Sequence, residues 1–212
     1  MSRLLSLLLF VGFAGSVACA AEYGVVTDPA RDTVYFRSTA KLEFIEGKTN
    51  NIDGGFSFDP QNPTAPVTGQ LRVDLRTLKT GIDMRDGHMR ERHLHTDKYP
   101  HAYFELDSVS GLPSTLAVDS TYNLTANGFF YIHGHKRKIE AKLELRRKPG
   151  DSGADAIMVR TRFSLNLDEY KIPRPKALFL KLAETIDVEV IFTAYNNLAI
   201  PKLELPDWPE FK

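Results

Sequence analysis

The stretch TYNLTANGFFYIHGHKRKIEAKLEL, residues 121–145, decides the fold because it reads as two long strands joined by a tight turn. In its first half, apolar or small residues occupy every second position from 122 to 132. In its second half they recur from 139 to 145, and charged residues stand between them. The residues 133–136 supply the turn. Alternation with a period of two is typical of half-buried strands, so the stretch predicts a long antiparallel hairpin.

The same alternation recurs on both sides of this hairpin. It predicts further strands over residues 33–38, 42–49, 55–59, 69–75, 102–107, 157–165 and 186–195. The chain has neither a strand-helix-strand rhythm nor a repeat of fixed period. We therefore expect an all-β fold with one short helix, a single antiparallel barrel of roughly eight strands. Such a barrel is either filled by side chains or just wide enough for one small ligand.

One helix-like segment, TGIDMRDGHMRERHLHTDKYPHAYFE at residues 80–105, interrupts the strands. Asp83 is placed to cap a helix over about Met84 to Leu94, with Asp86 as the acid of a capping box. Asp86 also stands four residues before Arg90, which favours an ion pair. A helix of this length is unstable alone, so we expect contacts with the barrel to hold it.

Four of the six histidines lie in this region, between Met84 and His101. On a helix, His88 and His95 share one side and His93 does not, and no metalloprotease spacing is present. We therefore predict no metal site. The expected role of His88 is structural, a hydrogen bond that fixes the helix to the barrel, and Arg85 and Asp86 are assigned to the same structural group.

The segment Met1 to Ala20 has the form of a secretory signal. Arg3 is followed by an apolar run over 4–14 and by the small residues Ala18-Cys19-Ala20. We predict cleavage near Ala20, a periplasmic or secreted protein, and no transmembrane segment after cleavage. An uncleaved membrane span and an acylated Cys19, as in lipoproteins, are the alternatives.

Composition excludes several classes of function. Removal of the signal, whose one charged residue is Arg3, leaves 27 − 1 = 26 basic residues against 27 acidic ones, so nucleic acid is not an expected partner. The one cysteine, Cys19, lies in the signal, which excludes disulfides and cysteine-based metal sites from the rest of the chain. No Gly-x-Ser-x-Gly motif is present. We expect neither an enzyme nor a cofactor.

Three motifs resemble the YceI-like, polyisoprenoid-binding family of secreted bacterial proteins. They are Thr80-Gly81 before the Arg85-Asp86-x-His88 helix, Lys98-Tyr99-Pro100 before a strand bearing phenylalanine, and the turn Ile132-His133-Gly134. The resemblance runs from about Thr33 to Tyr195. It implies a lipocalin-like, elongated barrel with a helix at one end. It also implies an apolar tunnel that holds a long-chain amphiphilic lipid of the polyisoprenoid or fatty-acyl type.

With this resemblance the chain divides into a signal peptide (1–20), a YceI-like β-barrel domain (21–196) and a proline-rich C-terminal tail (197–212). The tail carries apolar residues between its prolines, which predicts an extended segment lying on the barrel. The tail and Leu94-His95-Thr96 after the helix depart from the family's pattern.

Inward-facing apolar side chains are expected to line the tunnel, with the polar end of the ligand near the helix and the 172–183 loop. The predicted ligand-binding residues are Phe36, Phe44, Phe56, Phe58, Leu71, Val73, Phe104, Phe130, Phe163, Leu165, Phe179 and Leu182. The same residues suit a filled core equally well. The alternative function is therefore a structural or stress-response protein that acts through surface contacts without a lipid. A homodimer is compatible with either.

Overall fold

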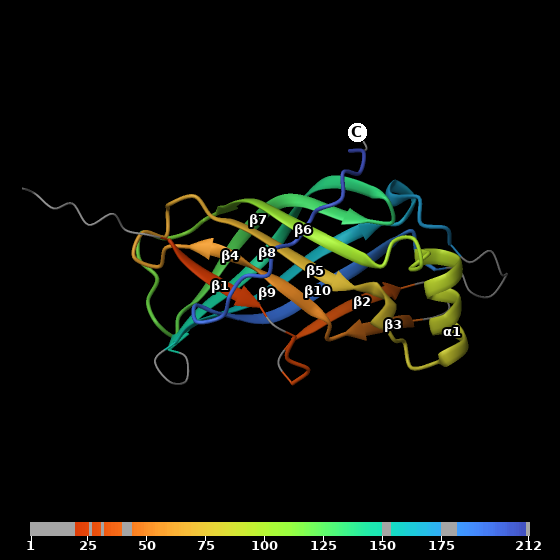
Figure 1. The fold of residues 1–212 in the computed structure, drawn as a ribbon, viewed down its shortest axis with the longest axis horizontal. Coiled ribbons are helices and arrows are strands. Elements are labelled where there is room, and N and C mark those ends of the chain that lie inside the picture. The colour runs from red at the N-terminus through yellow and green to blue at the C-terminus, as the bar shows by residue number, and fades with distance from the viewer. Residues whose placement is uncertain are drawn as a thin grey trace, which may run out of the picture.

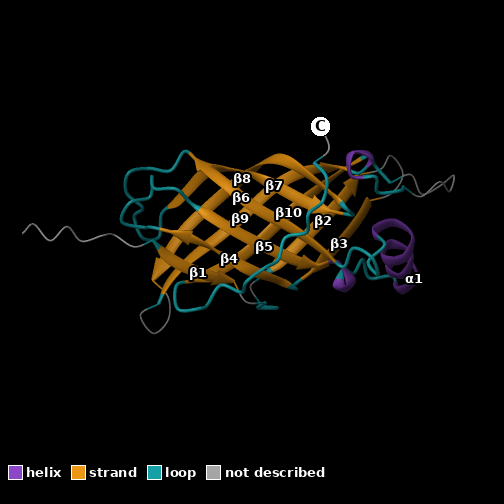
Figure 2. Cartoon of the chain, turned by 45° about the horizontal axis from the view of Figure 1, so that its top comes forward, coloured by secondary structure: helices purple, strands orange, loops and turns teal. Residues whose placement is uncertain are grey.

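A computed structural model describes residues 20–25, 27–30, 32–39, 44–149, 154–174 and 182–210. In these ranges ten antiparallel strands form one sheet, rolled into an elongated barrel that α1 crosses at one end (Figures 1 and 2). The strands are β1 (Ala21–Val25), β2 (Thr33–Thr39), β3 (Phe44–Thr49), β4 (Ile52–Phe58), β5 (Thr68–Asp74), β6 (His101–Ser110), β7 (Thr121–Ile132), β8 (His135–Pro149), β9 (Asp155–Asn166) and β10 (Thr185–Tyr195). The described helices are too short or too polar to span a bilayer.

The barrel closes where β1 meets β10, with Gly24 opposite Tyr195. The closed ring runs β1-β4-β5-β6-β7-β8-β9-β10, and the β2–β3 hairpin extends the wall beside β10. The prediction of a single antiparallel barrel of about eight strands is confirmed. The prediction did not include β1, because five residues give too short an alternation to stand out. This strand nevertheless supplies the closing contact.

Two sets of hydrogen bonds complete the barrel wall where neighbouring strands separate. Between β1 and β2 the buried carboxylate of Asp32 accepts hydrogen bonds from the N–H groups of Asp28, at 3.0 Å, and Thr193, at 3.2 Å. On the other side of the hairpin, the backbones of Lys48 in β3 and Lys79 exchange hydrogen bonds of 2.9 and 3.0 Å. Buried backbone groups at these bends are therefore paired despite the break in the ladder.

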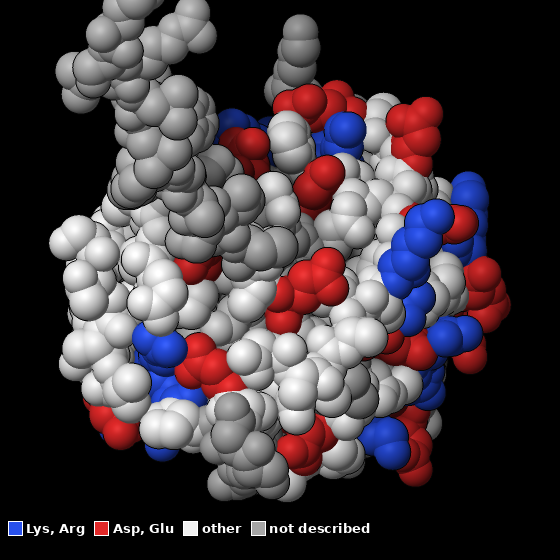
Figure 3. Space-filling view, turned by 60° about the vertical axis from the view of Figure 1, so that its left-hand side comes forward, with Lys and Arg blue, Asp and Glu red and all other residues white. Residues whose placement is uncertain are grey.

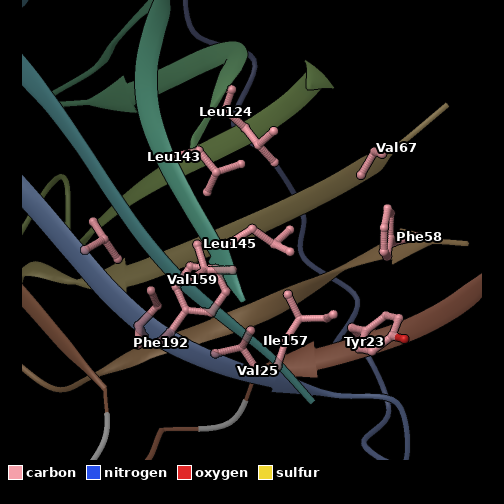
Figure 4. Packing of buried hydrophobic residues seen from close by; sticks show 14 of the residues in the cluster. Tyr23, Val25, Phe58, Val67, Leu124, Leu143, Leu145, Ile157, Val159 and Phe192 are labelled. Carbon is pink, nitrogen blue, oxygen red and sulfur yellow. The ribbon is translucent and has the colours of Figure 1, made fainter. Parts of the chain in front are cut away.

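The half of the barrel remote from α1 is filled. Side chains from β1, β4, β8, β9 and β10 point toward one another there, including Tyr23, Phe58, Leu145, Ile157 and Phe192 (Figure 4). The ring of Tyr23 is fully buried, and its hydroxyl donates to Asp155 at 2.9 Å. Asp155 also holds Arg147 at 3.0 Å. Burial, then the hydrogen bond to Asp155, raises the pKa of Tyr23.

At the opposite end the helical segment consists of α1 (Asp83–His88) and a π-helical turn (Met89–Leu94). Its N-cap is Ile82, and the predicted capping by Asp83 is wrong. The carboxylate of Asp86 accepts hydrogen bonds from the N–H of Thr80, at 2.7 Å, and from its hydroxyl, at 2.5 Å. Asp86 thus fixes the chain that leads into the helix. The expected Asp86–Arg90 pair is replaced, since the Arg90 guanidinium donates to the Leu78 carbonyl at 3.4 Å.

A pair of histidines joins the end of the helical segment to the β7–β8 turn. His133 is buried, and its Nδ1–H donates to the carbonyl oxygen of Tyr170 at 3.0 Å. Its Nε2 is therefore the acceptor for Nδ1–H of His95, 2.8 Å away. Burial lowers the pKa of His133, which favours this neutral form. The hydrogen bond that was expected from His88 comes from His133 instead, because His88 faces the barrel opening and makes no hydrogen bond with a described residue.

The C-terminal segment runs along the outside of the barrel (Figure 1). Its backbone at Leu198 and Ala199 approaches Gly24 so closely that a Cβ there would lie 2.7 Å from the Leu198 carbonyl oxygen. Further on, Trp208 packs edge-on against the rings of Tyr99 and Tyr103. The tail therefore packs against a glycine in β1 and against two tyrosine rings, one just before β6 and one within it.

The histidine pair gives a stability prediction. His133→Ala should lower the free energy of unfolding by about 1–3 kcal/mol, because it leaves the Tyr170 carbonyl and the His95 ring without a partner. His88→Ala is the matched control and should change it by less than about 0.5 kcal/mol. Urea unfolding of both variants measures the difference. Equal effects would contradict the assignment of the two rings.

The same ring makes stability depend on pH. Because the folded protein lowers the pKa of His133, its stabilisation is complete above the ordinary histidine pKa of about 6.5 and is lost as pH falls below it. His133→Gln removes this titration. The wild type should therefore lose more stability than His133→Gln between neutral and mildly acidic pH.

Candidate functional site: an apolar cavity beside the helix

A cavity of about 540 Å³ occupies the half of the barrel nearest α1. Its wall is formed by inward-facing side chains of the strands, and the helical segment lies at its opening. The wall is apolar apart from a few groups: Val34, Tyr35, Phe36, Ile45, Ile52, Leu71, Val73, Leu75, Leu78, Thr80, Ile82, Met84, Arg85, His88, Met89, His93, Leu94, Ala102, Tyr103, Phe104, Phe130, Ile132, Ala141, Thr161, Phe163, Leu165, Leu167, Ile172, Leu182, Ile186, Val188 and Val190.

Most of the predicted ligand-binding residues meet in this cavity. Those that line it are Phe36, Leu71, Val73, Phe104, Phe130, Phe163, Leu165 and Leu182. They come from β2, β5, β6, β7, β9 and the segment before β10, so strands distant in sequence contribute to one surface. The rings of Phe130 and Phe163 are in contact, with centroids 5.1 Å apart. Alternate residues of a strand face the same side of the sheet. The lining residues of each strand therefore all point into the barrel, where they meet.

Three of the other predicted residues lie elsewhere, and one is not described. Phe56 and Phe58 point inward but pack against Tyr23 in the filled half. Phe44 faces solvent with 61% of its surface exposed, because Ile45 and not Phe44 has the inward parity of β3. Phe179 lies outside the described residues, as do the predicted signal up to Cys19 and most of the loop that ends at Ala183.

Sequence reasoning missed the contribution of the helical segment. Ile82, Met84, Met89 and Leu94 line the cavity together with the wall residue Ile45. In the sequence the apolar residues of the helix form a narrow stripe, which indicates a helix that packs across another part of the protein. In the structure the helix lies across the barrel opening. Ile45 stands two residues before the buried Gly47, so both lie on the same face of the strand. This relation was also readable from the sequence.

The cavity ends where three neighbouring strands change from lining to packing. Along β8, β9 and β10, the lining residues Ala141, Thr161 and Val190 are each followed, two positions nearer the filled half, by a packed residue. These packed residues are Leu143, Val159 and Phe192. Val159 stands directly opposite Phe192 in the sheet. We refer to Leu143, Val159 and Phe192 as the floor.

Polar groups gather at the opposite end of the cavity, at its mouth. Arg85 donates from Nε to the hydroxyl of Thr80, at 2.8 Å, and from Nη2 to the Thr80 carbonyl, at 3.1 Å. His93 Nδ1–H donates to the carbonyl of Pro173 at 2.6 Å, which ties the helix to the segment after the 3₁₀ turn Asp168–Tyr170. Burial lowers the pKa of His93. The mouth therefore offers the Arg85 guanidinium and the His93 imidazole to a polar group.

The basic residues at the start of β8 are not among the lining residues of the cavity. Arg137 pairs with Glu169 at 3.1 Å, and Lys138 pairs with Asp107 at 3.5 Å. Lys136 lies over the rings of Phe129 and Tyr131. Within the described ranges, no three His, Cys, Asp or Glu side chains are grouped so that they could hold a metal ion. What the arrangement can do is shelter an apolar chain from water and leave a polar end at the opening.

Relatives with recognisable sequence similarity are named Protein YceI or UPF0312 protein. Protein YceI of Salmonella newport is 33% identical over 118 residues, which are 55% of this chain and 60% of that protein. A UPF0312 protein of Vibrio cholerae is 30% identical over 145 residues, 65% of this chain and 72% of that protein. A UPF0312 protein of Pseudomonas aeruginosa is 30% identical over 118 residues. The match spans 60% of the length of the Pseudomonas protein.

Solved structures share the fold. A polyisoprenoid binding domain from Saccharophagus degradans, implicated in plant cell wall breakdown, has a TM-score of 0.62 at 21% identity and covers 83% of this chain and 98% of that one. Burkholderia cenocepacia BcnA has a TM-score of 0.61 at 13% identity, covering 79% and 99%. The model of the YceI-like domain matches residues 26–194, which is nearly the whole barrel. The chain therefore belongs to the YceI-like family.

Proposed function

We propose that this protein is a periplasmic or secreted carrier that holds one long-chain amphiphile, of the polyisoprenoid or fatty-acyl type, with its tail in the cavity. The observation that carries the proposal is the 540 Å³ apolar cavity with its polar groups confined almost entirely to one end. An amphiphile has the same division between an apolar tail and a polar end. Membership of the family and the binding property named for the Saccharophagus domain support the same reading.

The floor limits how much tail the cavity accepts. A water molecule occupies roughly 30 Å³ of liquid, and a methylene group takes a similar space. A cavity of about 540 Å³ therefore has room for a tail on the order of 20 carbon atoms. We propose that the tail reaches from the mouth to Phe192 and that the preferred length within the barrel is about 15 to 20 carbons.

Burial of this tail supplies enough free energy for useful affinity. Apolar surface removed from water stabilises by roughly 25 cal/mol per Å², so several hundred Å² give micromolar binding or better after the cost of association. Affinity should depend on tail length more than on head group. The Arg85 guanidinium and the imidazole of His93 at the mouth can orient a head group without being buried beneath it.

The alternative is a structural or stress-response protein that acts through surface contacts. That function needs a filled interior, but only the half of the barrel beyond the floor is filled. The cavity favours the carrier. Export is the remaining part of the proposal, and it is supported by the pattern of Arg3, the apolar run after it and Ala18-Cys19-Ala20.

A bulky side chain in the wall tests occupation of the cavity. Phe163→Trp should weaken binding of fatty acids of about 16 carbons at least tenfold and should affect tails of about 8 carbons much less, because overpacking shortens the usable space. Met158→Trp, on the outer face of the same strand, is the control and should change neither. Titration of a chain-length series measures both. Affinity that does not rise with length would favour the surface-contact alternative.

A smaller residue in the floor tests the length limit. Phe192→Leu should move the preferred tail length upward by a few carbons, because the removed ring volume joins the cavity. Leu116→Ala opens a comparable void elsewhere in the packed half and should leave the preferred length unchanged. Competition between fatty acids of increasing length measures the optimum. An unchanged optimum in Phe192→Leu would place the end of the tail elsewhere.

Export has its own test. N-terminal sequencing and intact mass of the protein recovered from the periplasm or medium should give a chain that begins immediately after Ala20. A first residue of Met1 would contradict cleavage. An acylated Cys19 as the first residue would identify a membrane-anchored lipoprotein instead.

A further inference from the structure

The large apolar side chains that are exposed in the described ranges are Phe44, Ile82, Met84, Val118 and Met158. Met84 is 74% exposed, Phe44 61% and Ile82 53%. These three belong to the barrel end that α1 crosses, whereas Val118 and Met158 are on the loop after β6 and on the outer wall. We refer to Phe44, Ile82 and Met84 as the rim.

Backbone pairing brings the rim together from two separate segments. The reciprocal hydrogen bonds between Lys48 and Lys79 set the chain after Lys79 antiparallel to β3. The next pair along confirms the direction, because a Cβ on Gly47 would lie 3.1 Å from the methyl group of Thr80. Following both segments outward leads to Phe44 on one and to Ile82 and Met84 on the other. The rim residues therefore lie at the same end of the barrel, with Phe44 on the outer face of β3 and Ile82 and Met84 at the cavity opening.

The rim continues the cavity wall. Ile82 and Met84 are exposed to solvent and also line the cavity, so these two side chains connect the apolar wall with the outside, beside the polar groups of the mouth. A soluble carrier gains nothing from exposing such residues, since isolated apolar surface at an opening invites aggregation. A surface of this kind is instead suited to contact the medium from which an apolar ligand comes.

We propose that the rim docks on the surface of a lipid bilayer, so that the cavity opens directly onto the acyl-chain region while a ligand enters or leaves. The inference rests on the proposed function for the direction of ligand movement and adds the partner. Isoleucine, methionine and phenylalanine side chains can insert into the boundary between head groups and acyl chains, and the barrel itself stays in water.

Charge around the rim agrees with this partner. Lys48 and Lys79 are both exposed on the wall behind the rim, and neither forms an ion pair with a described residue. On the same strand Glu46 is neutralised by Arg37 at 2.8 Å. Asp83, between Ile82 and Met84, is the one opposing charge within the rim itself. Anionic lipids should therefore strengthen docking modestly.

The opposite end of the barrel differs. Acidic and basic side chains of both signs are scattered over it (Figure 3). Such a mixed surface has no preference for a bilayer and keeps the protein soluble. The molecule is therefore polarised along its long axis, with the apolar opening at one end.

Vesicle flotation tests the proposal with the purified protein and vesicles of phosphatidylcholine mixed with phosphatidylglycerol. The wild type should float with the vesicles, and Phe44→Ser should lower its partition coefficient about threefold to tenfold through lost apolar insertion. Ile82→Ser combined with Met84→Ser should lower it at least tenfold. Val118→Ser combined with Met158→Ser is the matched control and should float like the wild type. Equal flotation of all variants, or none of the wild type, overturns the proposal.

A second measurement separates docking from ligand binding. Phe44 does not line the cavity, so Phe44→Ser should keep the equilibrium affinity for a fluorescent fatty acid probe in solution while transferring that probe from vesicles more slowly. Vesicle docking without probe binding would refute the proposed carrier function and leave the docking surface standing. Light scattering tests whether a second copy of the chain covers the rim instead. A wild-type dimer that Phe44→Ser converts to a monomer would assign the rim to that second copy and overturn the bilayer proposal.

Discussion

Tyr23 ties the first strand to the filled end of the barrel, and the remaining wall depends on that tie. Its ring stacks on Phe56 with centroids 5.5 Å apart, and its hydroxyl reaches the Asp155–Arg147 pair at the start of β9. A buried hydroxyl without a partner would destabilise the core, whereas this one is satisfied by a charged acceptor. Dense packing around Tyr23 compensates for the contacts that the apolar side chains facing the cavity lack in the other half of the barrel.

Polar contacts add to apolar packing at the mouth. The helical segment has few apolar residues, and of these Met89 and Leu94 pack against the cluster that contains Leu78. Hydrogen bonds from Thr80 to Asp86, and from His95 to His133, fix the two ends of the segment. This division lets the lid of the cavity present apolar atoms inward without relying on a filled interior for its position. A ligand can then occupy the cavity without replacing the contacts that hold the helix.

Much of this architecture was readable from the sequence, and the errors have physical causes. Alternation in 121–145 fixed the hairpin and the inward face, since residue parity is the same for a core and for a cavity. For that reason it could not separate Phe56, which packs, from Phe163, which lines. Phe44 was placed inward on its residue type, although its parity with Ile45 pointed outward. His88 and His133 were equally plausible anchors until the fold showed which ring is buried, because hydrogen-bond partners such as the Tyr170 carbonyl are distant in sequence.

Closure between β1 and β10 joins the two ends of the barrel domain. The N-terminus is synthesised first, so β1 cannot pair with β10 until β10 has been made. Until that moment the wall has two open edges and encloses nothing. Contacts this distant in sequence also slow folding. The interior consequently becomes enclosed only once the chain has been completed through β10.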